Sequence, residues 1–201
     1  MSFFENTRKP EGLGGKMMVI MMNIGHRSVA RWGLQFLELA PDAKVLDCGC
    51  GGGANLKRLL KKCPQGVVKG IDYSPVSVEK SQKVNRADIA EGRCAVLQGN
   101  VADRIFPEEQ FDAVTAFETV YFWIDLPQCF REIRRVLKTG GTFLICNESN
   151  GDTRRDEKWT KRIDGMTIYK GTELKAYLEQ AGFHDVQIHK KKRWLCVTAR
   201  K

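Results

Sequence analysis

Acidic and amide side chains follow successive short apolar runs of this sequence, and glycines surround the first of them. Asp47 precedes Gly49, Gly51 and Gly53, while Asp72 and Asn100 come after the next two apolar runs. Glycine lets a bulky ligand approach the main chain closely. Carboxylate and amide oxygens accept hydrogen bonds from hydroxyl and amino groups of a ligand. This spacing therefore predicts a ligand site built on a glycine loop.

A second group of reactive side chains follows the fourth apolar run. Glu118, Tyr121, Phe122 and Trp123 lie within six residues of one another, and His26 stands far upstream. Glu118, Tyr121 and His26 are the candidate catalytic residues, because carboxylate, phenol and imidazole can move protons. A plainer interpretation stays open: the aromatic residues begin a helix and join the core, and His26 is a surface or capping residue.

The elements needed to position these groups follow from the hydrophobic pattern. From residue 44 onward, short β-branched runs alternate with longer helical patterns, which is typical of βαβ units and a parallel sheet. Pro75 behind Ser74 opens one helix, a short helix-like stretch follows Asn100, and the polar stretch 149–161 is expected to be one surface loop. The predicted strands are 44–48, 67–71, 94–97, 113–117, 142–146, 186–189 and 194–199, and the main helices are 54–62, 75–89, 127–137 and 172–180.

The two ends of the chain depart from this alternation. The basic run 190–193 separates the last two strands, and so short a connection cannot make a parallel crossover, so the final strand should run antiparallel to its predecessor. We expect an α/β, Rossmann-like, doubly wound seven-stranded sheet with helices on both faces. Residues 1–40 should form an N-terminal helical lid hinged at Gly12, Gly14 and Gly15, and residues 41–201 the core.

The run from 44 to 201 resembles class I S-adenosylmethionine-dependent methyltransferases. The likeness is greatest to their small-molecule branch, which looks like the ubiquinone/menaquinone methylases. The matching segments are, in order, VLDCGCGGG at 45–53, GIDYS at 70–74, GNV at 99–101, FDAVTAFETVYFW at 111–123 and VLKTGGTFLI at 136–145. The resemblance implies methyl transfer from S-adenosyl-L-methionine to a small molecule, with S-adenosyl-L-homocysteine as product. No Asp- or Asn-Pro-Pro-aromatic motif follows the fourth strand, which argues against nucleic-acid bases as acceptors.

The resemblance also implies individual roles. The glycine-loop backbone lines the methionine and ribose, Asp47 orients the amino-acid end, and Asp72 takes the ribose diol. Tyr73 flanks the adenine, and Asn100 and Val101 hydrogen-bond to it. Phe117 offers its carbonyl to the methionyl ammonium. Asn100 departs from the family's usual Asp and keeps the acceptor but loses the charge. The implied cofactor-binding residues are Asp47, Gly49, Cys50, Gly51, Asp72, Tyr73, Asn100, Val101 and Phe117.

Two other function classes stay open from the residues alone. Gly49-x-Gly51-x-x-Ala54 also satisfies the dinucleotide fingerprint of an NAD-dependent oxidoreductase. The net charge of +9 lies mainly in residues 152–201, with 13 basic and 7 acidic groups, which permits an RNA-directed methyltransferase or an RNA-binding relative. A solvated hairpin turn explains the basic run more simply, so nucleic acid is disfavoured as a partner.

The composition indicates the cellular compartment of the protein and whether it holds a metal or spans a membrane. None of the apolar runs reaches 18 residues, and the seven cysteines show no C-x-x-C or zinc spacing. We expect a cytoplasmic protein with reduced thiols, no membrane span and no metal, as a monomer or homodimer.

Overall fold

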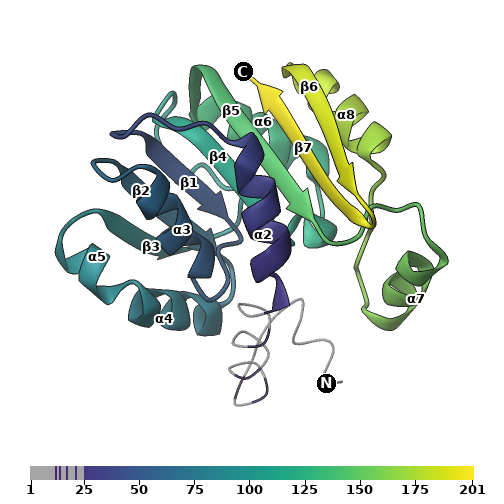
Figure 1. The fold of residues 1–201 in the computed structure, drawn as a ribbon, viewed down its shortest axis with the longest axis horizontal. Helices are drawn as coiled ribbons and strands as arrows, with labels where there is room; N and C mark the ends of the chain where they lie inside the picture. The colour runs from purple at the N-terminus through teal and green to yellow at the C-terminus, as the bar shows by residue number, and fades with distance from the viewer. Residues whose placement is uncertain (1–11, 13, 15–16, 18–20, 22–24) are drawn as a thin grey trace.

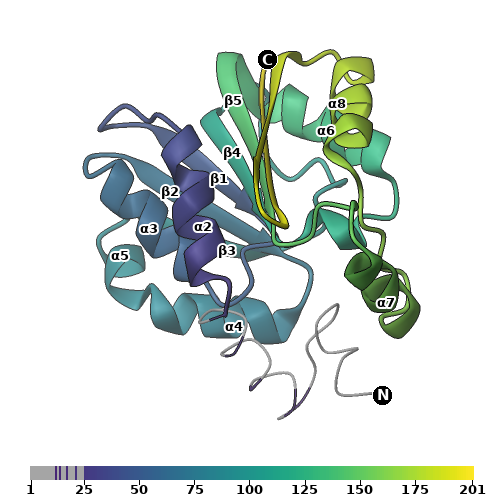
Figure 2. The same ribbon diagram turned by 45° about the vertical axis from the view of Figure 1, so that its right-hand side comes forward.

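The strands of this protein form one mixed sheet with helices on both faces (Figures 1 and 2). The structure is a computed structural model that describes residues 12, 14, 17, 21 and 25–201. The strands are β1 Lys44–Cys48, β2 Val67–Asp72, β3 Cys94–Gln98, β4 Phe111–Phe117, β5 Leu137–Asn147, β6 His184–Lys191 and β7 Trp194–Arg200. The helices are α2 Arg27–Gly33, α3 Ala54–Lys62, α4 Pro75–Val84, α5 Arg86–Ala90, α6 Leu126–Val136, α7 Arg154–Arg162 and α8 Gly171–Gln180, with short 3-10 turns η2 Leu34–Phe36 and η3 Val120–Phe122.

The strand order is β3-β2-β1-β4-β5-β7-β6, a seven-stranded sheet. Strands β1 to β5 pair in parallel, whereas β7 lies between β5 and β6 and is antiparallel to both. The connection from β6 to β7 is only two residues, Lys192 and Arg193, so the chain must reverse there. The predicted doubly wound sheet with a reversed last strand is confirmed. The basic run forms the turn only in part, because Lys190 and Lys191 belong to β6.

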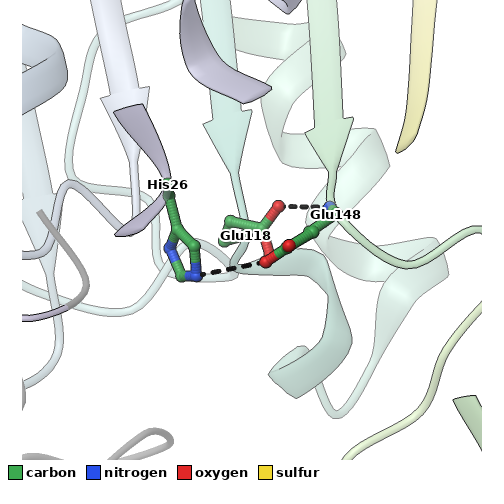
Figure 3. A group of neighbouring side chains, drawn as sticks. All are labelled: His26, Glu118 and Glu148. Atoms are coloured by element: carbon green, nitrogen blue, oxygen red, sulfur yellow. Dashed lines mark hydrogen bonds and ion pairs between the residues drawn. The ribbon is translucent and has the colours of Figure 1, made fainter. Parts of the chain in front are cut away.

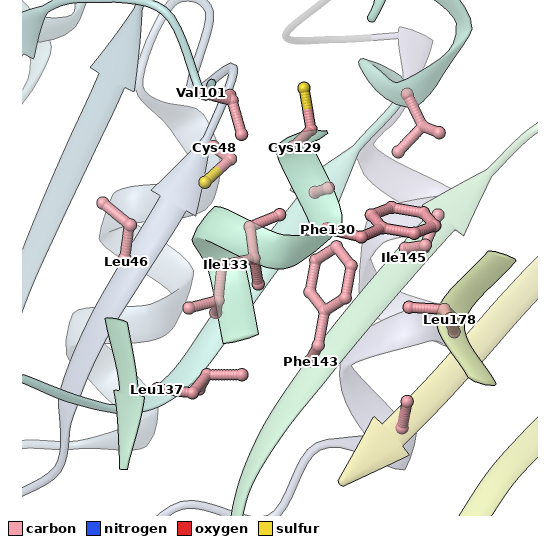
Figure 4. Packing of buried hydrophobic residues seen from close by; sticks show 14 of the residues in the cluster. Leu46, Cys48, Val101, Cys129, Phe130, Ile133, Leu137, Phe143, Ile145 and Leu178 are labelled. Carbon is pink, nitrogen blue, oxygen red and sulfur yellow. The ribbon is translucent and has the colours of Figure 1, made fainter. Parts of the chain in front are cut away.

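Neighbouring residues of each central strand pack into opposite layers. In β1, Val45 joins the core under α2 and α3, and Leu46 joins the core under α6 and α8. Figure 4 shows the second layer, where Phe130 and Ile133 of α6 contact Phe143 and Leu137 of β5. Burial on both faces makes these strands nearly continuous apolar runs, as expected for a parallel sheet between helical layers.

The helix after β2 is interrupted at Asn85. The predicted single helix 75–89 is instead α4 and α5, and the Ser74 cap is present, with its Oγ accepting from the Ser77 N–H at 3.4 Å. The Asn85 amide donates to the carbonyls of Gly53 (3.1 Å) and Ser81 (2.9 Å). The Asn85 side chain at the helix break therefore links the end of α4 to the glycine loop by hydrogen bonds.

Two sequence-based expectations about local structure are wrong. The stretch after Asn100 is a turn rather than a helix, because the Asn100 Oδ1 accepts from the Ala102 N–H at 3.0 Å and satisfies the backbone locally. The expected surface loop 149–161 contains α7. Thr153 and Asp156 form a capping box that starts this helix, a signal that the sequence already carried.

The described part of the N-terminal region packs against the sheet. Helix α2 lies over β5 so closely that a Cβ on Gly33 would meet the Cys146 Sγ at 2.4 Å. Met17 and Met21 are exposed. Half of the predicted lid, Gly15 included, lies outside the described residues, so the lid and the boundary at residue 40 stay predictions. No described helix combines the length and the apolar character needed to cross a membrane.

Candidate active site

The residues expected to bind a ligand gather at one edge of the sheet. Strands β1 to β4 are parallel, so their carboxyl ends meet at the same edge, which is where ligands bind in open α/β sheets. This carboxyl edge holds Asp47 at the end of β1, Asp72 at the end of β2, Asn100 just beyond β3, and Phe117 and Glu118 at the end of β4.

The backbone N–H groups of the glycine loop after β1 form hydrogen bonds with other residues of the protein. Gly49 and Cys50 both donate to the Ile71 carbonyl, at 2.8 and 3.0 Å, and Gly51 donates to the Asp72 Oδ2 at 2.9 Å. Gly51 has a positive φ of 51°, and a Cβ placed there would meet no protein atom within 4 Å. The loop is therefore open at Gly51, while its own N–H groups hold it in shape.

Asp47 and Cys50 lie beneath this loop. The Asp47 carboxyl is 1% exposed and accepts a hydrogen bond of 2.6 Å from the Thr115 hydroxyl. Burial, which outweighs that hydrogen bond, raises the pKa of Asp47 to about 7. The Cys50 thiol packs into the core 3.9 Å from the Ser81 hydroxyl.

A first cavity of about 110 Å³ opens at the carboxyl edge, and we call it cavity A. Five of the residues predicted to bind cofactor line it, namely Gly49, Asp72, Tyr73, Asn100 and Val101. Asp47, Cys50, Gly51 and Phe117 are not among its lining residues. The other residues that line it had no predicted role in cofactor binding, namely Ile71, Gly99, Thr119, Phe122, Trp123 and Ile124.

Asp72 supplies hydrogen-bond acceptors to the polar part of cavity A. The Asp72 carboxylate accepts the N–H groups of Gly51 and Ser74, each at 2.9 Å, and burial raises its pKa. Each carboxylate oxygen accepts more than one hydrogen bond, so Asp72 keeps capacity for ligand hydroxyls. A polar floor between the aromatic residues Tyr73, Phe122 and Trp123 suits a nucleoside.

A second cavity of about 180 Å³, which we call cavity B, contains all three candidate catalytic residues. His26, Glu118 and Tyr121 lie on its polar side together with Glu148, Ser149 and Arg193. Its apolar side consists of Phe122, Trp159, Ile163 and Met166. These residues come from the start of α2, the ends of β4 and β5, α7 with the segment after it, and the β6–β7 turn.

Glu118 is the central polar group of cavity B. Its backbone adopts a positive φ of 59°, and its side chain accepts a hydrogen bond from the Glu148 backbone N–H. Burial and the neighbouring Glu148 charge raise the pKa of Glu118 to about 8, opposed by hydrogen bonds from Glu148 and Tyr121 and by the Arg193 charge. A carboxyl group with a pKa near neutrality can exchange protons with a bound molecule.

The partners of Glu118 converge from distant parts of the chain. Figure 3 shows His26, Glu118 and Glu148 pointing toward one another from α2, β4 and β5. The His26 Nε2 lies 3.8 Å from the Glu148 Oε2, and Arg193 forms an ion pair with the same carboxylate. Burial lowers the pKa of His26, partly offset by Glu148. The Tyr121 hydroxyl accepts the Ser149 N–H at 3.0 Å.

Six of the residues that line cavity B were not predicted from the sequence, namely Glu148, Ser149, Trp159, Ile163, Met166 and Arg193. Glu148 stands just after a predicted strand, Arg193 was assigned to a solvated turn, and Trp159 fell within the expected loop. Only Trp159 had a usable signal, the capping box that begins its helix. The ligand-capable atoms of His26, Glu118 and Glu148 lie within 4.8 Å of one another, but Arg193 already occupies the Glu148 carboxylate. The predicted absence of a metal stays a prediction.

The two cavities share a wall built by residues 118–123. Glu118 and Tyr121 line cavity B, Thr119 and Trp123 line cavity A, and Phe122 lines both. Because the segment leaves β4 and enters η3, its side chains alternate between the two sides. A ligand in one cavity is therefore a close neighbour of a ligand in the other.

The fold and this carboxyl edge define a Rossmann-like methyltransferase of class I. A family model described as a methyltransferase domain matches residues 46–145. Among solved structures, a SAM-dependent methyltransferase from Aquifex aeolicus superposes with a TM-score of 0.75 and 20% identity, covering 92% of this chain and 97% of that one.

Curated relatives agree with the family match. Cycloartenol-C-24-methyltransferase of Arabidopsis thaliana is 34% identical over 156 residues, 73% of this chain and 46% of the plant protein. The Bacillus subtilis protein YrhH, also assigned to the methyltransferases, is 27% identical over 163 residues, 81% of each chain. This chain thus spans under half the length of the plant relative. It belongs to the S-adenosylmethionine-dependent methyltransferase family, which confirms the predicted resemblance and disfavours the NAD-dependent alternative.

Proposed function

We propose that this protein transfers a methyl group from S-adenosylmethionine in cavity A to a small molecule in cavity B. The observation that carries the proposal is the shared wall at residues 118–123, which places the two cavities side by side. S-adenosylmethionine supplies an electrophilic methyl group on a positively charged sulfur. Aligning an acceptor with such a group, and keeping water away, provides most of the rate in an in-line displacement.

The residues of cavity A fit the nucleoside part of this cofactor, and the rest of the cofactor would extend beyond the cavity's volume of about 110 Å³, along the open side of Gly51. Open space above Gly51 leaves room for it, and Asp72 offers acceptors for ribose hydroxyls. In our proposal Tyr73 flanks the adenine, and Asn100 and the Val101 N–H hydrogen-bond to it. Asp47 and the Phe117 carbonyl orient the amino-acid end, and the backbone of Gly49, Cys50 and Gly51 lies against the methionine and ribose.

The proton-handling residues are those of cavity B. Glu118 is the proposed general base, because it is the carboxyl group whose environment moves its pKa toward neutrality at this cavity. Tyr121 and His26 line the acceptor site beside Glu118 and are the further candidates for proton transfer, and the predicted lid of residues 1–40 covers the site. Cavity B accommodates a one-ring molecule, since an engineered cavity of roughly 150 Å³ holds benzene.

Calorimetry with S-adenosylmethionine and S-adenosylhomocysteine tests the proposal. A folded sample should bind both, and binding of neither would overturn the assignment of cavity A. The described cysteines are all free and buried, which fits a reducing compartment, so we infer a cytoplasmic location. We further expect a monomer or homodimer, which sedimentation velocity would reveal.

A further inference from the structure

Cavity B combines a carboxylate-rich side with an aromatic side. We propose that its methyl acceptor is a small aromatic amine, held as the ammonium ion beside Glu118 and Glu148 with its ring against Trp159 and Phe122. This inference rests on the proposed function and names the substrate class of the same site. It predicts methylation at nitrogen.

The charges around cavity B favour a cation over an anion. Glu118 and Glu148 present two carboxyl groups from the ends of adjacent strands β4 and β5. Arg193 is the one guanidinium or ammonium group among the residues that line the cavity, and it is paired with Glu148. The second basic side chain, His26, has a lowered pKa and is neutral near pH 7. An anionic acceptor would therefore face carboxylates without a free cationic partner in the described lining.

The apolar side of cavity B suits the rest of such a molecule. Trp159 of α7 and Ile163, which caps the end of that helix, line the cavity together with Phe122 and Met166. Pairs of aromatic rings attract one another, so the ring of the acceptor gains from packing against Trp159 and Phe122 while its ammonium group lies beside the carboxylates. The volume of about 180 Å³ is sufficient for one ring and a short arm.

Glu118 also provides a place for the proton that nitrogen must lose. A bound ammonium ion donates a proton to the Glu118 carboxylate, which leaves a neutral amine with a lone pair. That lone pair forms the bond to the methyl carbon as the carbon–sulfur bond breaks and its electron pair stays on sulfur. The product is the N-methylammonium ion, and Glu118 returns its proton to solvent before the next cycle.

Ammonium binding should release a proton from Glu118 at pH 7. With a pKa of about 8 the empty-site carboxyl is mostly protonated, and an adjacent cation favours its ionised form. The charged and titratable groups that face Glu118 are Glu148, Arg193, Tyr121, His26 and Cys146. Tyr121 and Cys146 have raised pKa values and stay neutral, so the released proton reports on Glu118.

The experiment compares matched amines, alcohols and carboxylic acids. Binding of 2-phenylethylamine and histamine is measured by calorimetry in the presence of S-adenosylhomocysteine, alongside the corresponding alcohols and acids. Two buffers with different ionisation enthalpies give the number of protons released. We expect at least one amine to bind about tenfold or more tightly than its alcohol, a difference of roughly 1.4 kcal/mol, with release of close to one proton at pH 7.

Substitutions identify the groups responsible. Glu118→Gln should abolish the proton release and remove the preference for amine over alcohol, whereas Glu179→Gln, on the exposed side of α8, should change neither. Alcohols or acids binding as tightly as every amine, or unchanged proton release in Glu118→Gln, would overturn the inference. If S-adenosylhomocysteine binds and the amine preference is absent, only this inference fails. If S-adenosylhomocysteine itself does not bind, the proposed function fails first.

Discussion

The Thr115 hydroxyl donates a hydrogen bond of 2.6 Å to the Asp47 carboxyl across the pairing of β4 with β1. This contact fixes a fully buried acidic group directly below the glycine loop. Removal of the carboxyl from water outweighs the hydrogen bond, and the pKa of Asp47 rises to about 7. The native state therefore holds a proton on Asp47 that the unfolded chain has already lost at pH 5 to 6.

Asp47→Asn should flatten the dependence of stability on pH. Between pH 4 and 7 the native state binds more protons at Asp47 than the unfolded state, so the free energy of unfolding falls as pH rises. At about 1.4 kcal/mol for each unit of pKa, this effect reaches up to about 4 kcal/mol. Asn keeps the acceptor for Thr115 and carries no charge. Urea unfolding of both proteins from pH 4 to 8 should show the variant gaining relative stability as pH rises, and parallel curves would contradict the buried-charge explanation.

Gly51→Ala should weaken cofactor binding in a way that Gly92→Ala does not. Both glycines have positive φ, 51° and 74°, and in both a Cβ would meet no protein atom within 4 Å. Each change costs about 1–2 kcal/mol of backbone strain. Only Gly51 borders the proposed cofactor, so its new methyl group should reduce S-adenosylmethionine affinity tenfold or more. Thermal unfolding and calorimetry separate the two effects, and equal affinities in the two variants would show that the cofactor lies elsewhere.

Asp72→Ala should weaken S-adenosylmethionine binding by about 1–3 kcal/mol, the range for buried hydrogen-bond partners left unmet. It should also lower stability, since the N–H groups of Gly51 and Ser74 lose their acceptor. Glu91→Ala, at an exposed position after α5, serves as the control. The affinity of the Asp72 variant for S-adenosylmethionine is measured well below its unfolding temperature. A value equal to that of the parent protein would mean that Asp72 does not hold the ribose.

Arg193→Met should raise the pKa of Glu118 above about 8. The guanidinium opposes the upward shift at Glu118 and compensates the Glu148 charge beside it. Lys192→Met, one residue away in the same turn and exposed, is the matched control. Carbon-13 NMR titration of labelled glutamate carboxyls measures the pKa directly. If the pKa of Glu118 changes in the Lys192 variant but not in the Arg193 variant, then Arg193 is not the charge that stabilises the Glu118 carboxylate.

Much of the fold can be predicted from local patterns in the sequence. Doubly buried strands are continuous apolar runs, and the Ser74–Pro75 start of α4 is encoded within a few residues. Local patterns failed where side chains compete with the backbone, as Asn100 does in its turn and Asn85 does by breaking a helix through contacts with Gly53 and Ser81.

The sequence by itself determined that the candidate ligand-binding residues gather at the carboxyl edge, because consecutive parallel strands must end there and their terminal residues are polar or glycine. Only the tertiary structure decided the composition of cavity B. His26, Glu118, Glu148 and Arg193 are separated by up to 167 positions along the chain, and no local periodicity relates them. Their protonation depends on burial and on one another's charges, which exist only once the sheet, α2, α7 and the last hairpin have packed together.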